Sequence, residues 1–193
     1  VMGVGNTASN VQHLTAIGSK NTVSDAKNTV IVGDNRKVTG ANNSVIIGSS
    51  DAETTTTVND AVAIGHNTEV SVEGGVALGS KSKATVAAGA AGYDISTKAA
   101  STDTTSTWKA TASAVSVGDV ANDVTRQITS VAAGTSDTDA VNVAQLKKVE
   151  TKISSVEADA KKHTTVVAGA NTTVTPGTNA NGGAEYKVAV NKD

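Results

Sequence analysis

The chain has 193 residues and a formal net charge of −2, and its hydrophobic share of 38% is low for a globular domain. With no Phe, one Trp and two Tyr, it cannot build a core of large aromatic side chains. The absence of Cys excludes disulfides, thiolate metal sites and cysteine nucleophiles. The 16 basic and 18 acidic side chains are scattered singly, which argues against nucleic acid as a partner, and no apolar run approaches the roughly 20 residues of a membrane span.

A short motif that ends in glycine recurs through residues 1–86. In each copy Val, Ile or Leu precedes the glycine, and Val usually stands two positions earlier, an alternation that predicts a short strand. Successive glycines are 13 to 17 residues apart, and one more copy follows position 113. The repeated positions are Gly5, Gly18, Gly33, Gly48, Gly65, Gly79 and Gly118, with the preceding residues Ile17, Val32, Ile47, Ile64 and Leu78.

Each copy predicts one coil of a parallel β-solenoid. Polar turn residues follow the glycine, and a weaker strand with a central Val, such as Val23, Val38 or Val70, comes next. Two strands and two turns form one coil of about 15 residues, and stacked coils about 4.8 Å apart pair as parallel sheets. The residue between the two apolar positions is small or apolar as well, so both faces of the strand are expected to meet protein. We therefore expect chains to pack side by side.

Two segments depart from this repeat. Residues 49–60 are longer than the other turns, and we expect residues 54–57 to form a solvated turn at which ligand contacts could vary. Residues 87–113 form an insertion that contains the only Trp, Trp108, and one of the two Tyr, Tyr93. We expect these two aromatic side chains to pack the insertion together.

Toward the C-terminus the apolar period changes to that of a coiled coil. A seam with spacings of three and four residues consists of Leu146, Val149, Ile153, Val156, Ala160 and His163. A short helix with one apolar stripe needs partners to bury that stripe. Residues 163–193 return to β patterning, with turns predicted at 176–177 and 181–183.

The order of these motifs closely resembles that of the trimeric autotransporter adhesins of Gram-negative bacteria, over residues 1–162. The resemblance is carried by the repeated strands at 44–49 and 61–65, the Gly-Tyr-Asp insertion with its Trp, the stretch at 114–119, Thr-Arg-Gln-Ile-Thr at 125–129, and the neck motif that runs into heptads at 138–147.

The resemblance implies a mainly β fold. Its head would be a left-handed parallel β-roll, a β-solenoid assembled as a homotrimer, followed by a neck, a short trimeric α-helical coiled coil and a β-rich stalk segment. The expected domains are β-roll head repeats at 1–86, a head insertion at 87–113, the last head strand and neck at 114–140, the coiled-coil stalk at 141–162 and the start of a β-rich module at 163–193.

The resemblance also implies a place and a role. The chain would be the head, neck and stalk of a virulence-associated adhesin at the cell surface, anchored in the outer membrane by a C-terminal barrel outside this sequence. Its partners would be two further copies of itself, and host extracellular matrix, cell-surface receptors or other bacteria. The ligand-binding residues cannot be assigned, because small polar surface residues form no recognisable pocket.

The neck motif of the family falls on residues between 126 and 142. The matching positions are Arg126, Gln127, Ile128, Asp137, Thr138, Asp139 and Asn142. Where a chain passes from a sheet to a helix bundle, backbone groups lose their partners and need side-chain substitutes. We hypothesise that Arg126 pairs with Asp137 or Asp139 of a neighbouring chain, and that Asp139 or Thr138 caps the helix.

Other functions fit the sequence less well. The Gly-x-Gly-x-x-Ala at 3–8 has no helix pattern after it, and His13, His66 and His163 lack metal-ligand spacing, so we expect no enzyme activity, no cofactor and no metal. The alternatives are a non-adhesive spacer, a surface-binding β-solenoid such as an ice-binding protein, and, least of all, a left-handed β-helix acyltransferase. The acyltransferase would require six-residue steps, whereas the spacings here are 13 to 17 residues. The ice-binding protein would require a regular Thr ladder, and the Thr residues here do not align.

Overall fold

The fold was obtained as a computed structural model that describes residues 1–160, 162 and 165–191. The chain divides into two compact units, residues 1–130 and 131–193, and each is described by itself. In the described part of the chain, no helix has both the length and the apolar character needed to cross a membrane.

The first unit consists of short strands and one 3-10 helix. Its elements are β1 (Thr7–Ser9), β2 (Thr15–Ile17), β3 (Thr22–Ser24), β4 (Val30–Val32), β5 (Arg36–Thr39), β6 (Val45–Ile47), β7 (Thr54–Thr56), β8 (Val62–Ile64), β9 (Glu69–Val70), β10 (Val76–Leu78), β11 (Lys83–Ala84), β12 (Tyr93–Asp94), β13 (Ala99–Ala100), β14 (Val115–Ser116) and η1 (Val120–Asn122).

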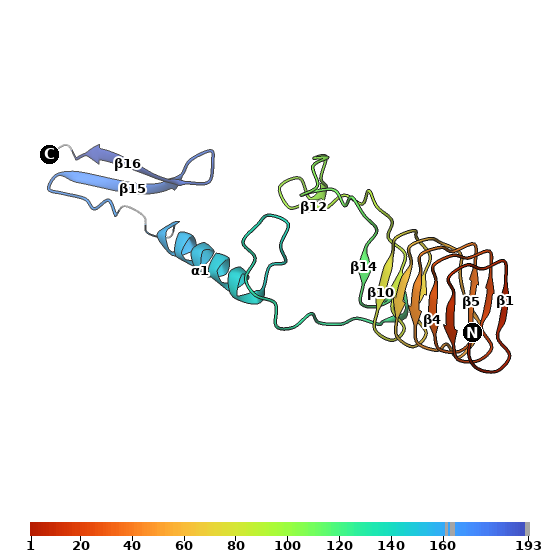
Figure 1. Cartoon of the computed structure of the whole chain (residues 1–193). Helices are drawn as coiled ribbons and strands as arrows, with labels where there is room; N and C mark the ends of the chain where they lie inside the picture. Colours follow the sequence, from red (N-terminus) through yellow and green to blue (C-terminus); the bar gives the residue numbers. More distant parts are fainter. Residues whose placement is uncertain (161, 163–164, 192–193) are drawn as a thin grey trace. The chain divides into compact units, whose positions relative to one another are not determined.

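These strands form a parallel β-solenoid of about five turns, as the repeat predicted. One sheet has the order β14-β10-β8-β6-β4-β2, and the opposite side of the coil is made by β1-β3-β5-β7 and by β11-β9. The register is unbroken along the first sheet, so that Ile17, Val32, Ile47, Ile64 and Leu78 occupy equivalent positions. Figure 1 shows the coils stacked one on the next. The left-handed sense and the homotrimer stay predictions.

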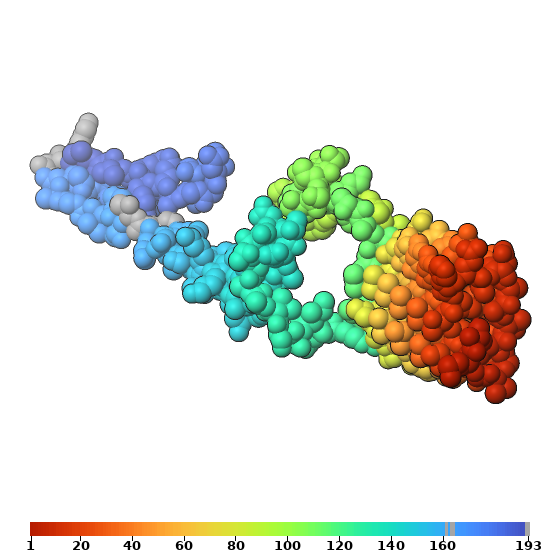
Figure 2. Space-filling view, in the orientation of Figure 1, coloured from red at the N-terminus to blue at the C-terminus, as the bar shows by residue number. Residues whose placement is uncertain are grey.

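The core is a narrow column inside the coils. The central residue of each three-residue strand of the six-stranded sheet points inward, and Ile31, Ile46 and Ala77 are fully buried. They face the central residues of the other side, among them Val23 and Val38. Because one small or β-branched side chain per strand fills this space, no aromatic ring is needed, and the coils pack as one continuous body from red to yellow in Figure 2.

A column of glycines lets the backbones of successive coils touch. A Cβ built on Gly33 would lie 2.6 Å from the carbonyl carbon of Gly48, and one on Gly65 would lie 2.6 Å from that of Gly79. Gly33 and Gly65 also have φ of +147° and +136°, values that residues with a Cβ rarely adopt. A side chain is therefore excluded at these positions.

The prediction that Gly5 is the repeated glycine of the first coil is wrong. Gly3, and not Gly5, lies against Gly18, because Met2 bridges to Ile17 and a Cβ on Gly3 would overlap the Gly18 carbonyl. Gly5 has φ of +71°, and a Cβ there would meet only the Lys20 region at 3.8 Å or more. Gly5 therefore serves a turn, and the glycine column starts at Gly3.

Residues 54–57 were also predicted wrongly as a solvated turn. Thr54–Thr56 form strand β7, which pairs in parallel with β5, and Thr56 points into the core and is 3% exposed. The extra residues of this coil lie before the strand, so that the solenoid continues through it.

The insertion is a small antiparallel sheet joined to the solenoid by the two chain segments that flank it. Tyr93 pairs with Ala100, and the N–H of Gly92 donates to the Trp108 carbonyl at 2.7 Å. A Cβ on Gly92 would lie 3.6 Å from Cε3 of Trp108, so the indole packs over this glycine as expected. Tyr93, in contrast, is 65% exposed, and the prediction that it packs the insertion is wrong for the single chain.

The second unit contains one helix and one hairpin. The helix α1 (Val143–Ala160) carries no buried residue. The hairpin pairs β15 (Thr172–Thr178) with β16 (Ala184–Val190) in antiparallel register, with Val174 opposite Val188. His163, predicted to end the apolar seam, lies outside the described residues.

Substitution of a column glycine tests the contact between coils. We expect Gly33→Ala to lower the free energy of unfolding by about 3 kcal/mol, because the methyl group meets the next coil's backbone and φ is positive. Gly40→Ala is the control, since Gly40 also has positive φ (+67°) but nothing within 4 Å of the added methyl, and it should cost about 1 kcal/mol. Urea unfolding at one protein concentration measures both, and equal losses would contradict the stacking.

Candidate interaction surfaces

The outward face of the six-stranded sheet carries a continuous row of aliphatic side chains, here called the apolar stripe. Its members are 37 to 42% exposed and lie in register on neighbouring strands. They are Ile17, Val32, Ile47, Ile64 and Leu78. A second row, Val30, Val45, Val62, Val76 and Val115, lies beside the stripe on the same face. Contiguous apolar surface of this kind marks a site of association.

The opposite outward face of the coil is polar. Thr7, Thr22, Lys37 and Thr55 form one row along the sheet, and the Ser24 hydroxyl lies 3.4 Å from that of Thr39 in the next row. Charges on this face are paired at the surface, as in the contact of 3.6 Å between Lys37 and Glu53. The two faces of the coil therefore differ sharply, one aliphatic and one hydroxylated and nearly neutral.

Side-chain donors satisfy the carbonyls of the glycine column from inside the coil. Asn6 donates through Nδ2 to the Gly18 carbonyl at 2.7 Å, and Asn21 donates to that of Gly33 at 2.8 Å. These side chains stand three residues after Gly3 and Gly18. Buried carbonyls need such partners. We call the inward set Asn6, Asn21, Arg36, Thr68 and Ser82 the polar column.

Arg36 is the charged member of the polar column and is 1% exposed. Its Nε donates to the Gly48 carbonyl at 2.8 Å, and its Nη2 reaches the Gly65 carbonyl at 3.2 Å. Its Nη1 donates to the Thr68 carbonyl at 2.7 Å. Burial lowers the pKa of the Arg36 guanidinium from its ordinary value. Three carbonyl dipoles from the next two coils therefore solvate this charge.

Arg36 compensates for an irregular coil. The residue three positions after Gly48 is Asp51, which is exposed and bonded to Asn67 and His66 at the surface. That coil thus lacks an inward donor, and the long Arg36 side chain reaches past it to Gly65. Sequence reasoning missed Arg36, although the position three residues after each column glycine signals it: Asn, Asn, Arg, Asp, Thr and Ser occupy that place in turn.

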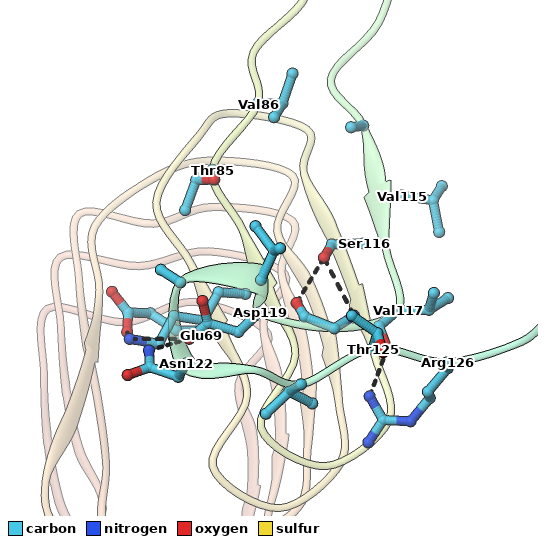
Figure 3. A pocket seen from close by; sticks show the side chains of 16 residues that line it. Glu69, Thr85, Val86, Val115, Ser116, Val117, Asp119, Asn122, Thr125 and Arg126 are labelled. Atoms are coloured by element: carbon cyan, nitrogen blue, oxygen red, sulfur yellow. Dashed lines mark hydrogen bonds and ion pairs between the residues drawn. The ribbon is translucent and has the colours of Figure 1, made fainter.

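The C-terminal end of the solenoid holds a hollow of about 650 Å³. Valines from β14 and η1, including Val115 and Val120, form its apolar lining. Figure 3 shows Glu69, Asp119 and Asn122 on one side of the hollow and Arg126 on the other. Val115, which continues the second row beside the stripe, is 61% exposed, and Val120 of η1 is 82% exposed, so this end of the solenoid also carries open apolar surface.

An ion-pair cluster closes one side of this end. Lys83 Nζ lies 3.3 Å from Glu69 and 3.6 Å from Asp119, whose side chain is 10% exposed. The hydrogen bond and charge of Glu69, followed by the charge of Asp119, raise the pKa of Lys83. Asn122 donates to Asp119 at 2.6 Å, so the cluster fixes η1 against the last coil.

Arg126 closes the other side of the C-terminal end of the solenoid. Its Nη2 donates to the Ser80 carbonyl at 2.6 Å, and its Nη1 donates to the Ser82 hydroxyl at 3.1 Å and to the Val117 carbonyl. The guanidinium is thus occupied by oxygens of its own solenoid. Its pairing with Asp137 or Asp139 of a neighbouring chain stays a prediction.

The start of α1 is capped by Asn142. The N–H of Gln145 donates to Asn142 Oδ1 at 3.1 Å, and the N–H of Asn142 donates to Gln145 Oε1 at 3.2 Å. This reciprocal pair is a capping box. The prediction that Asp139 or Thr138 caps the helix is therefore wrong. Gln145, which sequence reasoning overlooked, also bonds both backbone groups of Gly134, at 3.1 Å each.

Asp139 instead closes a turn that precedes the helix. Its Oδ2 accepts from the N–H groups of Thr135 and Ser136, at 2.9 Å each. The Ser136 bond, followed by those from Thr135, holds the pKa of Asp139 below its usual range. The turn is thus stabilised at pH values above the ordinary pKa of Asp, and this stabilisation is lost as the pH falls through the lowered pKa.

The other predicted neck and seam residues lie at the surface of the described chain. Asp137, Thr138, Gln127 and Ile128 are exposed. The seam residues of α1 are also open to solvent, with Leu146, Val149, Ile153 and Val156 between 54% and 63% exposed, and Ala160 exposed as well.

The histidines of the solenoid belong to surface ladders. His13 Nδ1 lies 3.1 Å from Asn28 Oδ1, and His66 Nε2 lies 3.1 Å from Asp51. Among the described residues, no three His, Cys, Asp or Glu side chains gather in a way that could hold a metal ion. The Gly-rich stretch at 3–8 stands at the start of the glycine column and the polar column.

Comparison with known proteins points to one family. Residues 127–186 match the family described as the coiled stalk of trimeric autotransporter adhesin. The chain is 54% identical over 79 residues to autotransporter adhesin BadA of Bartonella henselae, a match that covers 41% of this chain and 3% of that protein. It is 52% identical over 77 residues to trimeric autotransporter adhesin AtaA of Acinetobacter sp. (strain Tol 5), covering 37% and 2%. The chain therefore spans a very small part of either relative.

Removal of the buried charge tests the polar column. We expect Arg36→Ala to lower the free energy of unfolding by about 3 to 5 kcal/mol, because it removes the Arg36 donors from the buried Gly48 and Thr68 carbonyls, which lie in two successive coils. Lys37→Ala, at the next position but on the outward face, is the control and should cost about 0 to 1 kcal/mol. Denaturant titration compares the two, and similar losses would contradict a special role for Arg36.

Truncation of Asn142 tests the helix cap. Asn142→Ala should lower the stability of α1 by about 1 kcal/mol, since the N–H of Gln145 loses its acceptor. Thr138→Ala should have a much smaller effect, because Thr138 is exposed and lies before the cap. Thermal melting of the helical circular-dichroism signal measures both variants. A larger effect at Thr138 would reverse the assignment.

Proposed function

We propose that this chain, which belongs with the trimeric autotransporter adhesins, is a head, neck and stalk segment that assembles as a homotrimer and presents its polar outer face for attachment. The observation that carries the proposal is the apolar stripe, an ordered row of exposed aliphatic side chains on one face of a coil whose other face is polar.

Association of three copies through the stripe would remove most of this apolar surface from water. Such burial stabilises by about 25 cal/mol per Å². A single coil has little core of its own, since Ala, Val and Ile supply all of its buried hydrophobic side chains. The trimer thus supplies the burial that the thin coil lacks.

The helix supports the same assembly. The seam residues Leu146, Val149, Ile153 and Val156 are all more than half exposed in one chain, and an isolated helix of 18 residues is only marginally stable in water. A three-stranded coiled coil would bury the seam and would join the three solenoids to one stalk.

The polar sheet face is the surface that remains for ligands. It carries hydroxyl groups in rows and nearly balanced charge, so it suits many weak contacts better than one tight pocket. Three copies on one stalk raise the avidity of such contacts. We propose host matrix, cell surfaces or other bacteria as targets, display at the outer membrane, and no enzymatic role.

Charge placed on the stripe tests the assembly. Light scattering should give about 57 kDa for the native chain, three times 19.1 kDa. Ile47→Glu should shift the mass toward a single chain, because three carboxylates would be buried together. Thr55→Glu, on the polar face, should leave the trimer intact.

Attachment is tested with the same proteins. The native trimer should bind immobilised matrix proteins or cells, and Ile47→Glu should bind far more weakly because avidity is lost. A native chain of 19.1 kDa in solution would contradict the trimer. A stable trimer that binds no matrix protein and no cell surface would identify a spacer.

A further inference from the structure

We propose that Arg126 is a mechanical latch that keeps the last coil of the solenoid closed when the chain is pulled from its C-terminal side. The proposal rests on the adhesin function above, because attachment to a surface is what would place the chain under tension. It concerns contacts within one chain, so it is separable from trimer formation.

At Gly79, Arg126 fills the place that the backbone of the next coil has at earlier glycines of the column. At Gly33, Gly48 and Gly65, a built Cβ meets the backbone of the next coil, whereas at Gly79 it meets the Arg126 side chain, with Cζ at 3.0 Å and Nε at 3.1 Å. The guanidinium therefore covers Gly79. Its donors meet oxygens there, as Arg36 does inside the stack.

The contacts of Arg126 join two pieces of chain that are far apart in sequence. Nη2 holds Ser80 and Nη1 holds Ser82, both in the turn after β10, while Nη1 also holds the Val117 carbonyl at the end of β14. One side chain thus ties the final strand to the preceding coil. Charge-assisted bonds from a guanidinium are stronger than neutral ones, and the fork shape engages several acceptors together.

The strand that Arg126 secures is otherwise lightly held. β14 has two residues and pairs on one side only, with Val76 and Ala77 of β10. Interior strands of this sheet, such as β6, have three residues and pair on both sides. Edge elements with few buried contacts open first. Besides Arg126, two contacts of Lys83 hold this end: its N–H donates to the Gly118 carbonyl at 2.9 Å, and its Nζ lies 3.6 Å from Asp119.

Tension from the C-terminal side would reach Arg126 first. In the described chain, residues 127–130 make no hydrogen bond, and Arg126 is the last residue with bonds to the solenoid. Rupture of the Arg126 contacts would free β14. The two segments that lead into and out of the insertion would then separate; they are held by bonds such as that from the Ala114 N–H to the Val86 carbonyl at 3.0 Å. Residues 87–126 would extend by roughly 130 to 145 Å, while the earlier coils stay folded.

The test is single-molecule stretching of the whole chain between its two ends. We expect a first event that releases roughly 130 to 145 Å, followed by separate unfolding of the coils. Arg126→Lys keeps the charge but loses the fork, and should shorten the lifetime of the first event at constant force by about threefold to tenfold. Arg36→Lys is the matched control and should weaken the later events only.

Gly79→Ala gives a second, independent test. Its methyl group would lie against the guanidinium and displace it, so the first event should again be shortened while Arg126 is retained. A first event of another length, or an unchanged lifetime in both Arg126→Lys and Gly79→Ala, would overturn the latch. Light scattering on the same variants should still give the trimer mass, and its loss in the native chain would contradict the proposed function instead.

Discussion

The contact of backbone on backbone at the glycine column constrains the rest of the molecule. From Gly3 to Gly65, each glycine of the column lies against the peptide of the next coil, with no space for a Cβ. Coils that stack this closely enclose only a thin interior, which Ala, Val and Ile fill. The Val, Ile and Leu side chains of the apolar stripe and of the row beside it are then left on the outer face of the sheet. A composition poor in aromatic residues follows from this geometry and is no sign of disorder.

Close stacking also leaves backbone carbonyls inside the coil that need hydrogen-bond donors. The column carbonyls are turned away from water and need donors, which Asn6 and Asn21 supply where the coils are regular. Where one coil is longer and the residue three positions after its column glycine, Asp51, is exposed, a buried arginine spans two coils. At the end of the stack, Arg126 provides donors to Ser80 and Val117 in a similar way. One requirement thus explains both arginines, although one is buried and the other is exposed.

The repeat predicted the parallel solenoid and most of its strands, because apolar alternation and glycine spacing report the coil directly. It could not decide between Gly3 and Gly5, which fit the same pattern, since only stacking on Gly18 distinguishes them. Arg36 was missed because a lone charged residue is normally read as exposed. The cap was misplaced onto Asp139 because several polar residues precede α1, and the helix start at Val143 decides which one is used. The seam and the trimer depend on contacts between chains, which one chain does not contain.

The proposed trimer requires that the apolar stripe of one copy lies against that of another. Because the native chain has no Cys, a spin label can be placed at a single introduced Cys. Pulsed dipolar spectroscopy on Ile47→Cys should give a well-defined, short distance between chains, and Thr55→Cys on the opposite face should give a clearly longer one. A short distance at Thr55→Cys, or no interchain distance at Ile47→Cys, would contradict the account.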